Sequence, residues 1–340
     1  MEVMTQAEHR VCPVVEGSQP SAVRAAARES AGAAGFDETD AYRAGIVATE
    51  LATNLVKHAT DGGSVLVRSF SEDGCRGVEL IAIDRGPGVP SVSESLRDGH
   101  STAGSSGTGL GAIQRMSDEF DIHSQPGRGT AIMARLFAGR RRPPAAPLSF
   151  GAVSVAMVAE DPCGDAWAVR QRDRSMTVFV ADGLGHGLFA AEAARAAVTA
   201  WTKESARPLA DALAVIHDAL RHTRGAAGAL AHLDLENSVV RFAGVGNICG
   251  SITNNGVSRQ MVSHNGTLGH QAHHFREFAY PWSDDGVFVM HSDGLTTHWT
   301  LDGYPGLARR HPAVIAAVLY RDFNRGRDDA TVLVCRATAE

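Results

Sequence analysis

Carboxylates beside glycines, or beside one another, recur at the ends of apolar runs in the second half of this chain. The four sites are Asp165 in CGDAW, Asp182 in VADGLGHG, Asp293 in MHSDGL, and Asp328 with Asp329 in GRDDATVLV. An isolated Asp-Gly pair usually marks a turn. Four acidic sites that all adjoin strand-like runs would bring several carboxylates into one space, where like charges need a metal ion. Because hard oxygen ligands favour Mg²⁺ or Mn²⁺ over zinc, the pattern predicts a binuclear centre of such ions.

A polar stripe runs along one predicted helix in the first half. Glu50, Asn54 and His58 stand at positions i, i+4 and i+8 in ELATNLVKHA, which places them on one helical face. A carboxylate, an amide and an imidazole in a row can hold a ligand, and they can equally form an ordinary solvated face. The stripe alone leaves both interpretations open.

Glycine-rich turns follow this helix in the sequence. Asp84 opens DRGPGVP directly after the apolar run VELIAI, where its carboxylate can accept a hydrogen bond from an exocyclic amine. GSSGTGLGAIQRM begins at Gly104 and leads into a predicted helix, so it offers backbone N–H groups and a helix N-terminus to phosphates. GRGT, at 127–130, adds another tight turn. One glycine loop is weak evidence, but the four elements in this order predict a nucleotide site.

The elements that must position these residues are mixed. In the first half, helical spacing covers 21–32, 40–58 and 108–118, and strand-like runs cover 64–70, 77–83 and 129–136. In the second half, strand-like runs cover 153–158, 167–170, 176–181, 239–243, 251–253, 286–290 and 331–335, with helices at 189–204, 209–221 and 312–321. Many strands in antiparallel style with a few helices predict an α+β fold in both halves.

The clearest boundary is GRRRPPAAP at 139–147, which cannot continue a helix or a central strand. We therefore expect a first domain at 1–138, a linker at 139–147 and a second domain at 148–340. A long surface loop within one domain is the alternative.

Bulk composition excludes several classes of protein. A length of 340 residues suits two domains, and a net charge of −6 gives no basic field for nucleic acid. The five cysteines form no CxxC pair, so neither a disulfide framework nor a zinc site is expected. We find no signal peptide and no run of the roughly 18 apolar residues that a membrane span needs. The sequence predicts a cytoplasmic protein with reduced thiols.

The motifs of the first half resemble the GHKL ATPase superfamily, in its small anti-sigma-factor and switch-kinase branch. ELATNLVKHA is similar to that family's N-box, DRGPG to its adenine box, and TAGSSGTGLGAIQRMSDEFDIHSQPGRGT to its later glycine boxes. The resemblance covers 19–136 and implies an α/β sandwich that holds ATP with Mg²⁺. It implies that Asn54 coordinates Mg²⁺, that Asp84 binds adenine and that Glu50 is the general base toward a partner's Ser or Thr hydroxyl. The other cofactor-binding positions that it implies are Gly86, Gly88, Gly107, Thr108, Gly109, Leu110, Gly111 and Thr130.

The acidic motifs of the second half resemble the protein phosphatase 2C (PP2C) superfamily, in its bacterial sporulation and stress-response branch. The resemblance covers 149–336 and implies a β-sandwich flanked by helices, in which two Mn²⁺ or Mg²⁺ ions activate a bridging water. It implies that Asp182 bridges the ions and serves as the central catalytic carboxylate. The further metal ligands that it implies are the Gly183 carbonyl, Asp293, Asp328 in preference to Asp329, and Asp165.

Other residues near these motifs have less certain roles. His186 in the second motif is a general acid or a structural residue. AGVGNI, at 243–248, is interpreted as scaffolding. The arginine with which large phosphatases grip phosphate has no clear equivalent in this sequence. The histidines at 264, 270, 273 and 274 have no regular ligand spacing, and an exposed polar loop is favoured over a third metal site.

Together the two resemblances imply a bifunctional regulator of a bacterial partner-switching pathway. The first domain would phosphorylate Ser or Thr on a STAS-type anti-sigma-factor antagonist, and the second would remove that phosphate. The alternative is a phosphatase whose first domain only binds, in an ATP-dependent way, a phosphoprotein or a sigma factor. Neither nucleic acid nor membrane is expected as a partner, and a homodimer is possible because related ATPase domains often dimerise.

Overall fold

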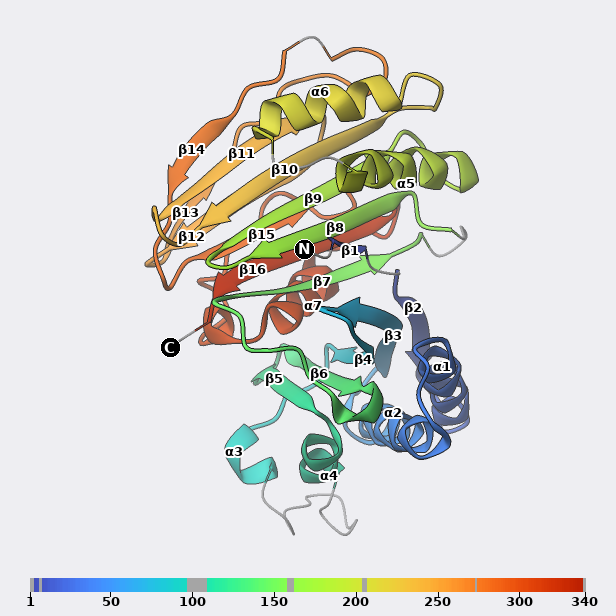
Figure 1. The fold of residues 1–340 in the computed structure, drawn as a ribbon. Helices are drawn as coiled ribbons and strands as arrows, with labels where there is room; N and C mark the ends of the chain where they lie inside the picture. The colour runs from blue at the N-terminus through green and yellow to red at the C-terminus, as the bar shows by residue number, and fades with distance from the viewer. Residues whose placement is uncertain are drawn as a thin grey trace. The chain divides into compact units, whose positions relative to one another are not determined.

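The structure of the chain is a computed structural model that describes residues 3–5, 8–96, 109–157, 162–203, 207–272 and 274–338. Contacts within the chain divide it into two compact units (Figure 1). The N-terminal unit comprises His9–Pro144 and Tyr304–Arg321, and the C-terminal unit comprises Met1–Glu8, Ala145–Gly303 and Asp322–Glu340. Neither unit is a single stretch of chain. The expected sequence domains at 1–138, 139–147 and 148–340 stay a prediction.

The N-terminal unit is built on an antiparallel sheet with strand order β2-β3-β4-β6-β5. The strands are β2 (Arg10–Val14), β3 (Gly63–Glu72), β4 (Cys75–Asp84), β5 (Glu119–Gln125) and β6 (Gly129–Phe137). The helices are α1 (Pro20–Ala33), α2 (Glu38–His58), α3 (Val92–Ser95) and α4 (Gly109–Met116). Alternate residues of the strands, such as Val65, Leu80 and Ala134, share a buried core with α1 and α2. One face of the sheet is therefore covered by helices.

A segment from the end of the sequence completes this unit. Tyr304–Arg321 contains η2 (Leu307–Arg309) and most of α7 (Pro312–Phe323). Asp121 in β5 accepts hydrogen bonds from the His311 backbone N–H at 2.6 Å and from Arg310 at 3.3 Å. Arg321 donates to the Asp84 carbonyl oxygen at 3.1 Å. Side-chain and backbone contacts thus attach this segment to β4 and β5.

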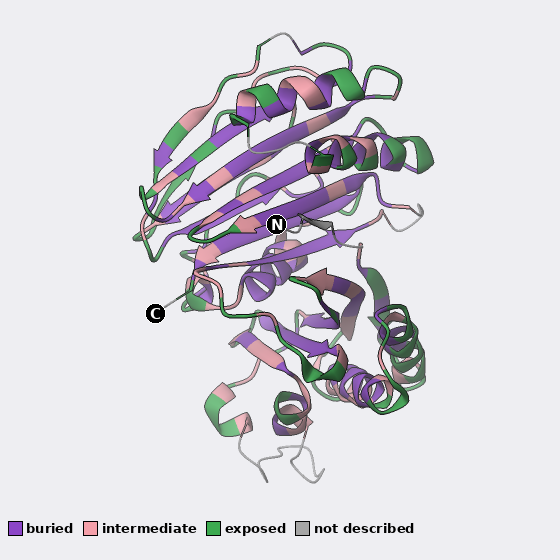
Figure 2. Ribbon diagram, in the orientation of Figure 1, coloured by how far each residue is buried: buried purple, intermediate pink, exposed green. Residues whose placement is uncertain are grey.

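The C-terminal unit is a sandwich of two antiparallel sheets, with strand orders β1-β8-β9-β10-β11-β14 and β13-β12-β15-β16-β7. The first sheet comprises β1 (Val3–Thr5), β8 (Asp165–Arg172), β9 (Ser175–Gly183), β10 (Ala226–Asp234), β11 (Val239–Val245) and β14 (Phe278–Pro281). The second comprises β7 (Leu148–Val155), β12 (Cys249–Asn254), β13 (Val257–Gln260), β15 (Val287–His291) and β16 (Ala330–Ala337). Most residues of the central strands are buried (Figure 2).

Strand alternation explains the layers of this unit. In β9, Val178 and Val180 face the core between the sheets, where they join Phe288 and Leu333 of the second sheet. The intervening residue Phe179 faces outward and packs with α5 (Leu188–Lys203) and α6 (Leu209–Ala219). Period-2 patterning therefore gives each strand of this sheet one side for the sandwich and one side for the helices.

The structure confirms the expected α+β class, with an α/β sandwich in one unit and a helix-flanked β-sandwich in the other. The expected helices at 21–32, 40–58 and 209–221 correspond to α1, α2 and α6. The strands β1, β2, β5, β10, β13 and β14 were not expected from the sequence. After η1 (Ala138–Arg140), residues 141–147 have no regular structure, as their prolines require. Among the described residues, no helix has the length and hydropathy to span a membrane.

A buried charge cluster lies within the sheet of the N-terminal unit. The Glu79 carboxylate is fully buried and accepts hydrogen bonds at 2.6 Å from Arg68 and at 2.6 Å from Arg135, while His9 lies 3.2 Å away. Burial acts to raise the pKa of Glu79, but Arg68, Arg135 and His9 outweigh it and hold that pKa well below its usual range. The cluster is therefore ionised and paired.

We predict that Glu79→Gln destabilises the N-terminal unit by about 3–5 kcal/mol, because it leaves two buried guanidinium groups without their counter-charge. Glu29→Gln is the control, since Glu29 makes an exposed ion pair with Arg10 and should change little. Denaturant unfolding monitored by circular dichroism measures both variants. Equal midpoints for the two would contradict the assigned role of the cluster.

Candidate functional site

Four strand ends bring the acidic residues of the C-terminal unit together. Asp165 begins β8 and Asp182 lies near the end of β9, and the register of the two strands pairs them directly. Both have the parity of inward-facing residues, since Trp167 and Val180 lie in the core between the sheets. Asp293 follows β15 and Asp328 precedes β16, and these strands pair through His291 and Val332. Antiparallel pairing therefore delivers each acidic motif to one edge of the sandwich.

Three of these carboxylates line a cavity of about 560 Å³, and they are Asp182, Asp293 and Asp328. His186 lines the same cavity. Asp165 does not; it is buried, and it accepts a 2.7 Å hydrogen bond from Ser292. Both oxygens of Asp329 are occupied by backbone N–H groups, of Met157 at 2.6 Å and of Gly164 at 2.7 Å. Of the final pair, Asp328 is thus the residue at the cavity, and its role as a ligand stays a prediction.

The carboxylates of this edge repel one another. Burial, together with the charges of Asp165, Asp293 and Asp328, raises the pKa of Asp182 to about 9. Burial also raises the pKa of Asp165 to about 7, with Asp329 and Asp293 adding to the effect. The protein's own groups therefore stabilise these negative charges poorly, whereas divalent cations would offset them.

The donor set fits Mg²⁺ or Mn²⁺, since every candidate ligand is an oxygen. Across the described residues, no three His, Cys, Asp or Glu side chains already form a compact cage. Gly183 allows the close packing at this point, because a Cβ on it would lie 2.0 Å from the Ala190 carbonyl oxygen. Asp182, Asp293, Asp328 and the Gly183 carbonyl are the groups that would hold the ions.

Two residues at the cavity were not predicted as site residues from the sequence. Asn247 lies in AGVGNI, which was interpreted as scaffolding, and its side-chain amide donates a 2.7 Å hydrogen bond to Asp293. Arg327 precedes Asp328 and also lines the cavity, although no arginine was expected there. The only signal for them in the sequence was their position, Asn247 within AGVGNI and Arg327 directly before Asp328. Of the clustered histidines, 264, 270 and 274 are absent from the lining, and residue 273 lies outside the described residues.

The N-terminal unit gathers the predicted nucleotide residues around α2, β4 and β6. Glu50, Asn54 and His58 follow one another along α2. Gly109 begins α4, and a Cβ on it would lie 3.2 Å from Oδ1 of Asn54. Leu110 and Gly111 continue that helix, whereas Gly107 and Thr108 lie outside the described residues. The helix N-terminus therefore stands beside the amide that was expected to hold Mg²⁺.

Two observations fit a ligand at this place. In the described part of the chain, Nδ2 of Asn54 is buried and makes no hydrogen bond. Burial raises the pKa of Asp84, and this effect is opposed by hydrogen bonds from the Gly86 and Thr130 backbone and by the charge of Arg321. An amide with an unused donor and a carboxylate at the end of β4 suit a polar ligand such as ATP with Mg²⁺.

Two glycine turns meet beside Asp84. The Gly127 N–H donates to the Pro87 carbonyl at 2.8 Å, which joins the turn after Asp84 to the turn before β6. Gly129 has φ 87°, and a Cβ on it would lie 2.0 Å from the Asp84 carbonyl oxygen. The two turns can approach this closely only because residue 129 is glycine.

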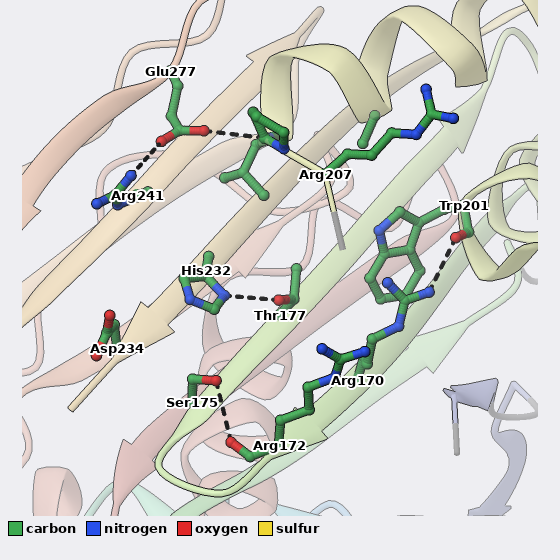
Figure 3. A pocket seen from close by; sticks show the side chains of 13 residues that line it. Arg170, Arg172, Ser175, Thr177, Trp201, Arg207, His232, Asp234, Arg241 and Glu277 are labelled. Atoms are coloured by element: carbon green, nitrogen blue, oxygen red, sulfur yellow. Dashed lines mark hydrogen bonds and ion pairs between the residues drawn. The ribbon is translucent and has the colours of Figure 1, made fainter. Parts of the chain in front are cut away.

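A second cavity, of about 420 Å³, lies on the helix-covered face of the first sheet (Figure 3). Arg170 stacks on Trp201 at 4.5 Å and donates to its carbonyl oxygen, while Glu277 accepts a hydrogen bond from the Leu209 backbone. His232 shares a 2.9 Å hydrogen bond with Thr177. None of the predicted site residues lies here, and these contacts attach α5 and α6 to the sheet.

Comparison with known proteins identifies the family of each half of the chain. The family model of the histidine kinase-like ATPase domain matches residues 16–136, and that of stage II sporulation protein E (SpoIIE) matches 172–338. The serine/threonine-protein kinase RsbT of Bacillus subtilis is 36% identical over 113 residues, which cover 33% of this chain and 84% of the relative. The chain belongs to the histidine kinase-like ATPase family, and it carries a PP2C-type phosphatase domain in its second half.

Two further similar proteins cover a larger share of this chain. The phosphoserine phosphatase RsbX of Bacillus subtilis is 23% identical over 134 residues, which cover 39% of this chain and 67% of the relative. A solved structure from work on the bacterial stressosome is 29% identical with a TM-score of 0.52, covering 56% of this chain and 99% of the other. Part of this chain thus covers 84% of RsbT, and part of it covers 67% of RsbX.

We predict that Asp182→Asn raises the melting temperature of the metal-free phosphatase domain, because it removes one of several repelling carboxylates, and that it abolishes stabilisation by Mn²⁺. Asp173→Asn is the matched control, because Asp173 lies in the turn between β8 and β9 with φ 42°, which asparagine also tolerates. Differential scanning calorimetry with and without Mn²⁺ separates the effects. An unchanged Mn²⁺ response in Asp182→Asn would exclude this residue as a ligand.

In the ATPase domain, Gly129→Ala should abolish ATP binding, because its Cβ would force apart the turns that carry Asp84 and Thr130. Gly127→Ala is the control; residue 127 also has a positive φ, of 76°, but nothing lies within 4 Å of its Cβ position. We expect it to cost about 1 kcal/mol of stability and to leave ATP binding nearly unchanged. Isothermal titration calorimetry measures the binding. Equal ATP affinities would contradict the close approach.

Proposed function

We propose that this protein both adds and removes a phosphate on a Ser or Thr of a STAS-type partner, an anti-sigma-factor antagonist in a bacterial partner-switching pathway. The observation that carries the proposal is the convergence of Asp182, Asp293 and Asp328 on one cavity, in a chain that also sets Asn54 beside Gly109 at the start of α4. The names of two relatives, a serine/threonine-protein kinase and a phosphoserine phosphatase, support the pairing of activities. We place the reaction in the cytoplasm, where ATP is available.

In the phosphatase domain, Asp182, Asp293, Asp328 and the Gly183 carbonyl would hold two Mn²⁺ or Mg²⁺ ions. Such ions supply a water of lowered pKa and offset the charge of the phosphate. The protein's own contribution is to hold the carboxylates in place. Asn247 fixes one oxygen of Asp293, and Ser292 fixes Asp165 beside Asp182. Arg327, at the same cavity, brings a positive charge toward the phosphate.

In the ATPase domain, Asn54 would hold Mg²⁺ and Asp84 would accept a hydrogen bond from the adenine amine. Glu50 lies one helical turn before Asn54 and is half-buried. Its carboxylate would take the proton from the partner's hydroxyl as the γ-phosphate is transferred. Gly109, Leu110 and Gly111, at the N-terminus of α4, present backbone N–H groups of the kind that bind phosphates.

Transfer of labelled γ-phosphate from ATP to a STAS-domain protein of the same genome tests the kinase activity. The assay uses Asp182→Asn protein so that the product survives. We expect labelling that Glu50→Ala reduces by about 10²-fold or more and that Glu38→Ala, an exposed change on the same helix, leaves unchanged. Unmutated protein with Mn²⁺ should then erase the label.

The same assay distinguishes a binding module from a kinase. If ATP and the partner bind but no label is transferred, the ATPase domain captures its partner, a phosphoprotein or a sigma factor, without modifying it. In that case Glu50→Ala changes little, and removal of phosphate by the phosphatase domain is the protein's one reaction on the partner.

A further inference from the structure

Apolar side chains are exposed beside the catalytic cavity. Leu184, Leu188 and Phe189 are exposed by 56%, 56% and 57%, and all three lie within seven residues after the predicted ligand Asp182. The other large apolar side chains that are exposed among the described residues are scattered through the sequence, at Val11, Val15, Tyr42, Val257 and Val262. A local group of exposed apolar residues marks a surface that a partner covers.

The first turn of α5 explains why these side chains face outward. The helix buries Ala190, Ala191, Ala193 and Ala194 against the sheet. Leu188 and Phe189 stand at its N-terminus, before that alanine-rich face begins. Smaller or polar residues would serve the helix equally well at exposed positions. Packing of α5 therefore does not account for a leucine and a phenylalanine there.

Arg224 lies against this group of side chains. Its guanidinium lies 5.0 Å from the centre of the Phe189 ring, and its Nη1 lies 3.2 Å from the Cβ position of Gly185. The Leu184 N–H donates to the Gly225 carbonyl at 3.0 Å, which ties the two segments together. A guanidinium stacked by its face keeps its N–H edge for planar acceptors such as phosphate or carbonyl oxygens.

We propose that Leu184, Leu188, Phe189 and Arg224 form a docking rim for the protein segment that carries the phosphoserine or phosphothreonine. The proposal rests on the phosphatase function proposed above. Leu184 lines the cavity itself, so the rim is continuous with the site where the phosphate must lie. An apolar side chain next to the phosphorylated residue packs on Leu188 and Phe189, and Arg224 contacts the phosphate or the adjoining backbone. The rim thus selects protein substrates over small phosphate esters.

Synthetic peptides test this surface directly. Two fluorescein-labelled ten-residue phosphoserine peptides are used, one with leucines and one with serines on both sides of the phosphoserine. We expect the full-length protein to bind the leucine peptide about tenfold more tightly by fluorescence anisotropy, in line with the burial of one or two apolar side chains. Phe189→Ser should abolish this preference, and Val257→Ser, at an exposed position on β13 away from the cavity lining, should keep it.

Arg224 is tested with the same peptides. Arg224→Gln should weaken binding of both peptides about fivefold, because the contact is with phosphate or backbone and not with the flanking side chains. Arg221→Gln is its control, since Arg221 pairs with Asp218 on the exposed end of α6. Equal affinities for Arg224→Gln and the unmutated protein would remove Arg224 from the rim.

Hydrolysis of p-nitrophenyl phosphate separates docking from chemistry. Phe189→Ser should hydrolyse this small ester at the unmutated rate, since the ester is too small to reach the rim. A leucine preference that is absent from the unmutated protein, or that survives Phe189→Ser, would overturn the docking rim. A change of oligomeric state in Phe189→Ser would also overturn the proposal, because a second copy of the chain would then be what covers Phe189. No hydrolysis by unmutated protein would instead count against the phosphatase function.

Discussion

Repulsion among the carboxylates at one edge of the sandwich is the constraint on which the phosphatase domain depends. The antiparallel pairing of β8 with β9 sets Asp165 directly opposite Asp182, and the ends of β15 and β16 add Asp293 and Asp328. The fold holds three of the carboxylates at this edge by hydrogen bonds. Ser292 binds Asp165, Asn247 binds Asp293 and backbone N–H groups bind Asp329. Asp182, Asp293 and Asp328 face the cavity, where divalent cations would offset their negative charge.

In the ATPase domain the charges are reversed, because the proposed ligand, ATP, itself carries the negative charge. Its site offers donors: Nδ2 of Asn54, the N-terminus of α4 and the backbone of glycine turns. Close approach of two turns at Gly129 sets the position of Asp84 by contact between backbones. The ionised Glu79 cluster in the same sheet fixes β3, β4 and β6 to one another through Arg68 and Arg135. Rigid strands and short turns are what a site for a multiply charged nucleotide requires.

Prediction from the sequence succeeded where a residue able to bind a metal lies at the end of a strand. An aspartate that follows an apolar run must lie at a strand end, so the convergence of Asp182, Asp293 and Asp328 could be predicted. Asn247 and Arg327 could not, because their positions depend on which loops meet across the sandwich. The strand β10 was missed because AAGALAHLD is rich in alanine and lacks the β-branched residues typical of strands. Hydrophobic spacing predicted the helix at 312–321, but such spacing reveals a buried face and never the partner of that face.

The helix at 312–321 lies in a segment that the chain contributes to the N-terminal unit. The chain leaves Asp293, passes through Tyr304–Arg321 in the N-terminal unit and returns to Asp328. In the phosphatase domain the two ends of this excursion are hydrogen-bonded to each other, since the Thr296 N–H donates to the Phe323 carbonyl and the Arg325 N–H donates to the Gly294 carbonyl. On the ATPase side, Arg321 donates to the carbonyl of Asp84. The segment between the predicted metal ligands Asp293 and Asp328 therefore contains residues of the N-terminal unit, and one of them, Arg321, contacts the carbonyl of the predicted adenine ligand Asp84. Fusion of the two domains consequently involves more than the proline-rich linker, because an excised phosphatase domain would contain this segment without the β4 and β5 contacts that hold it.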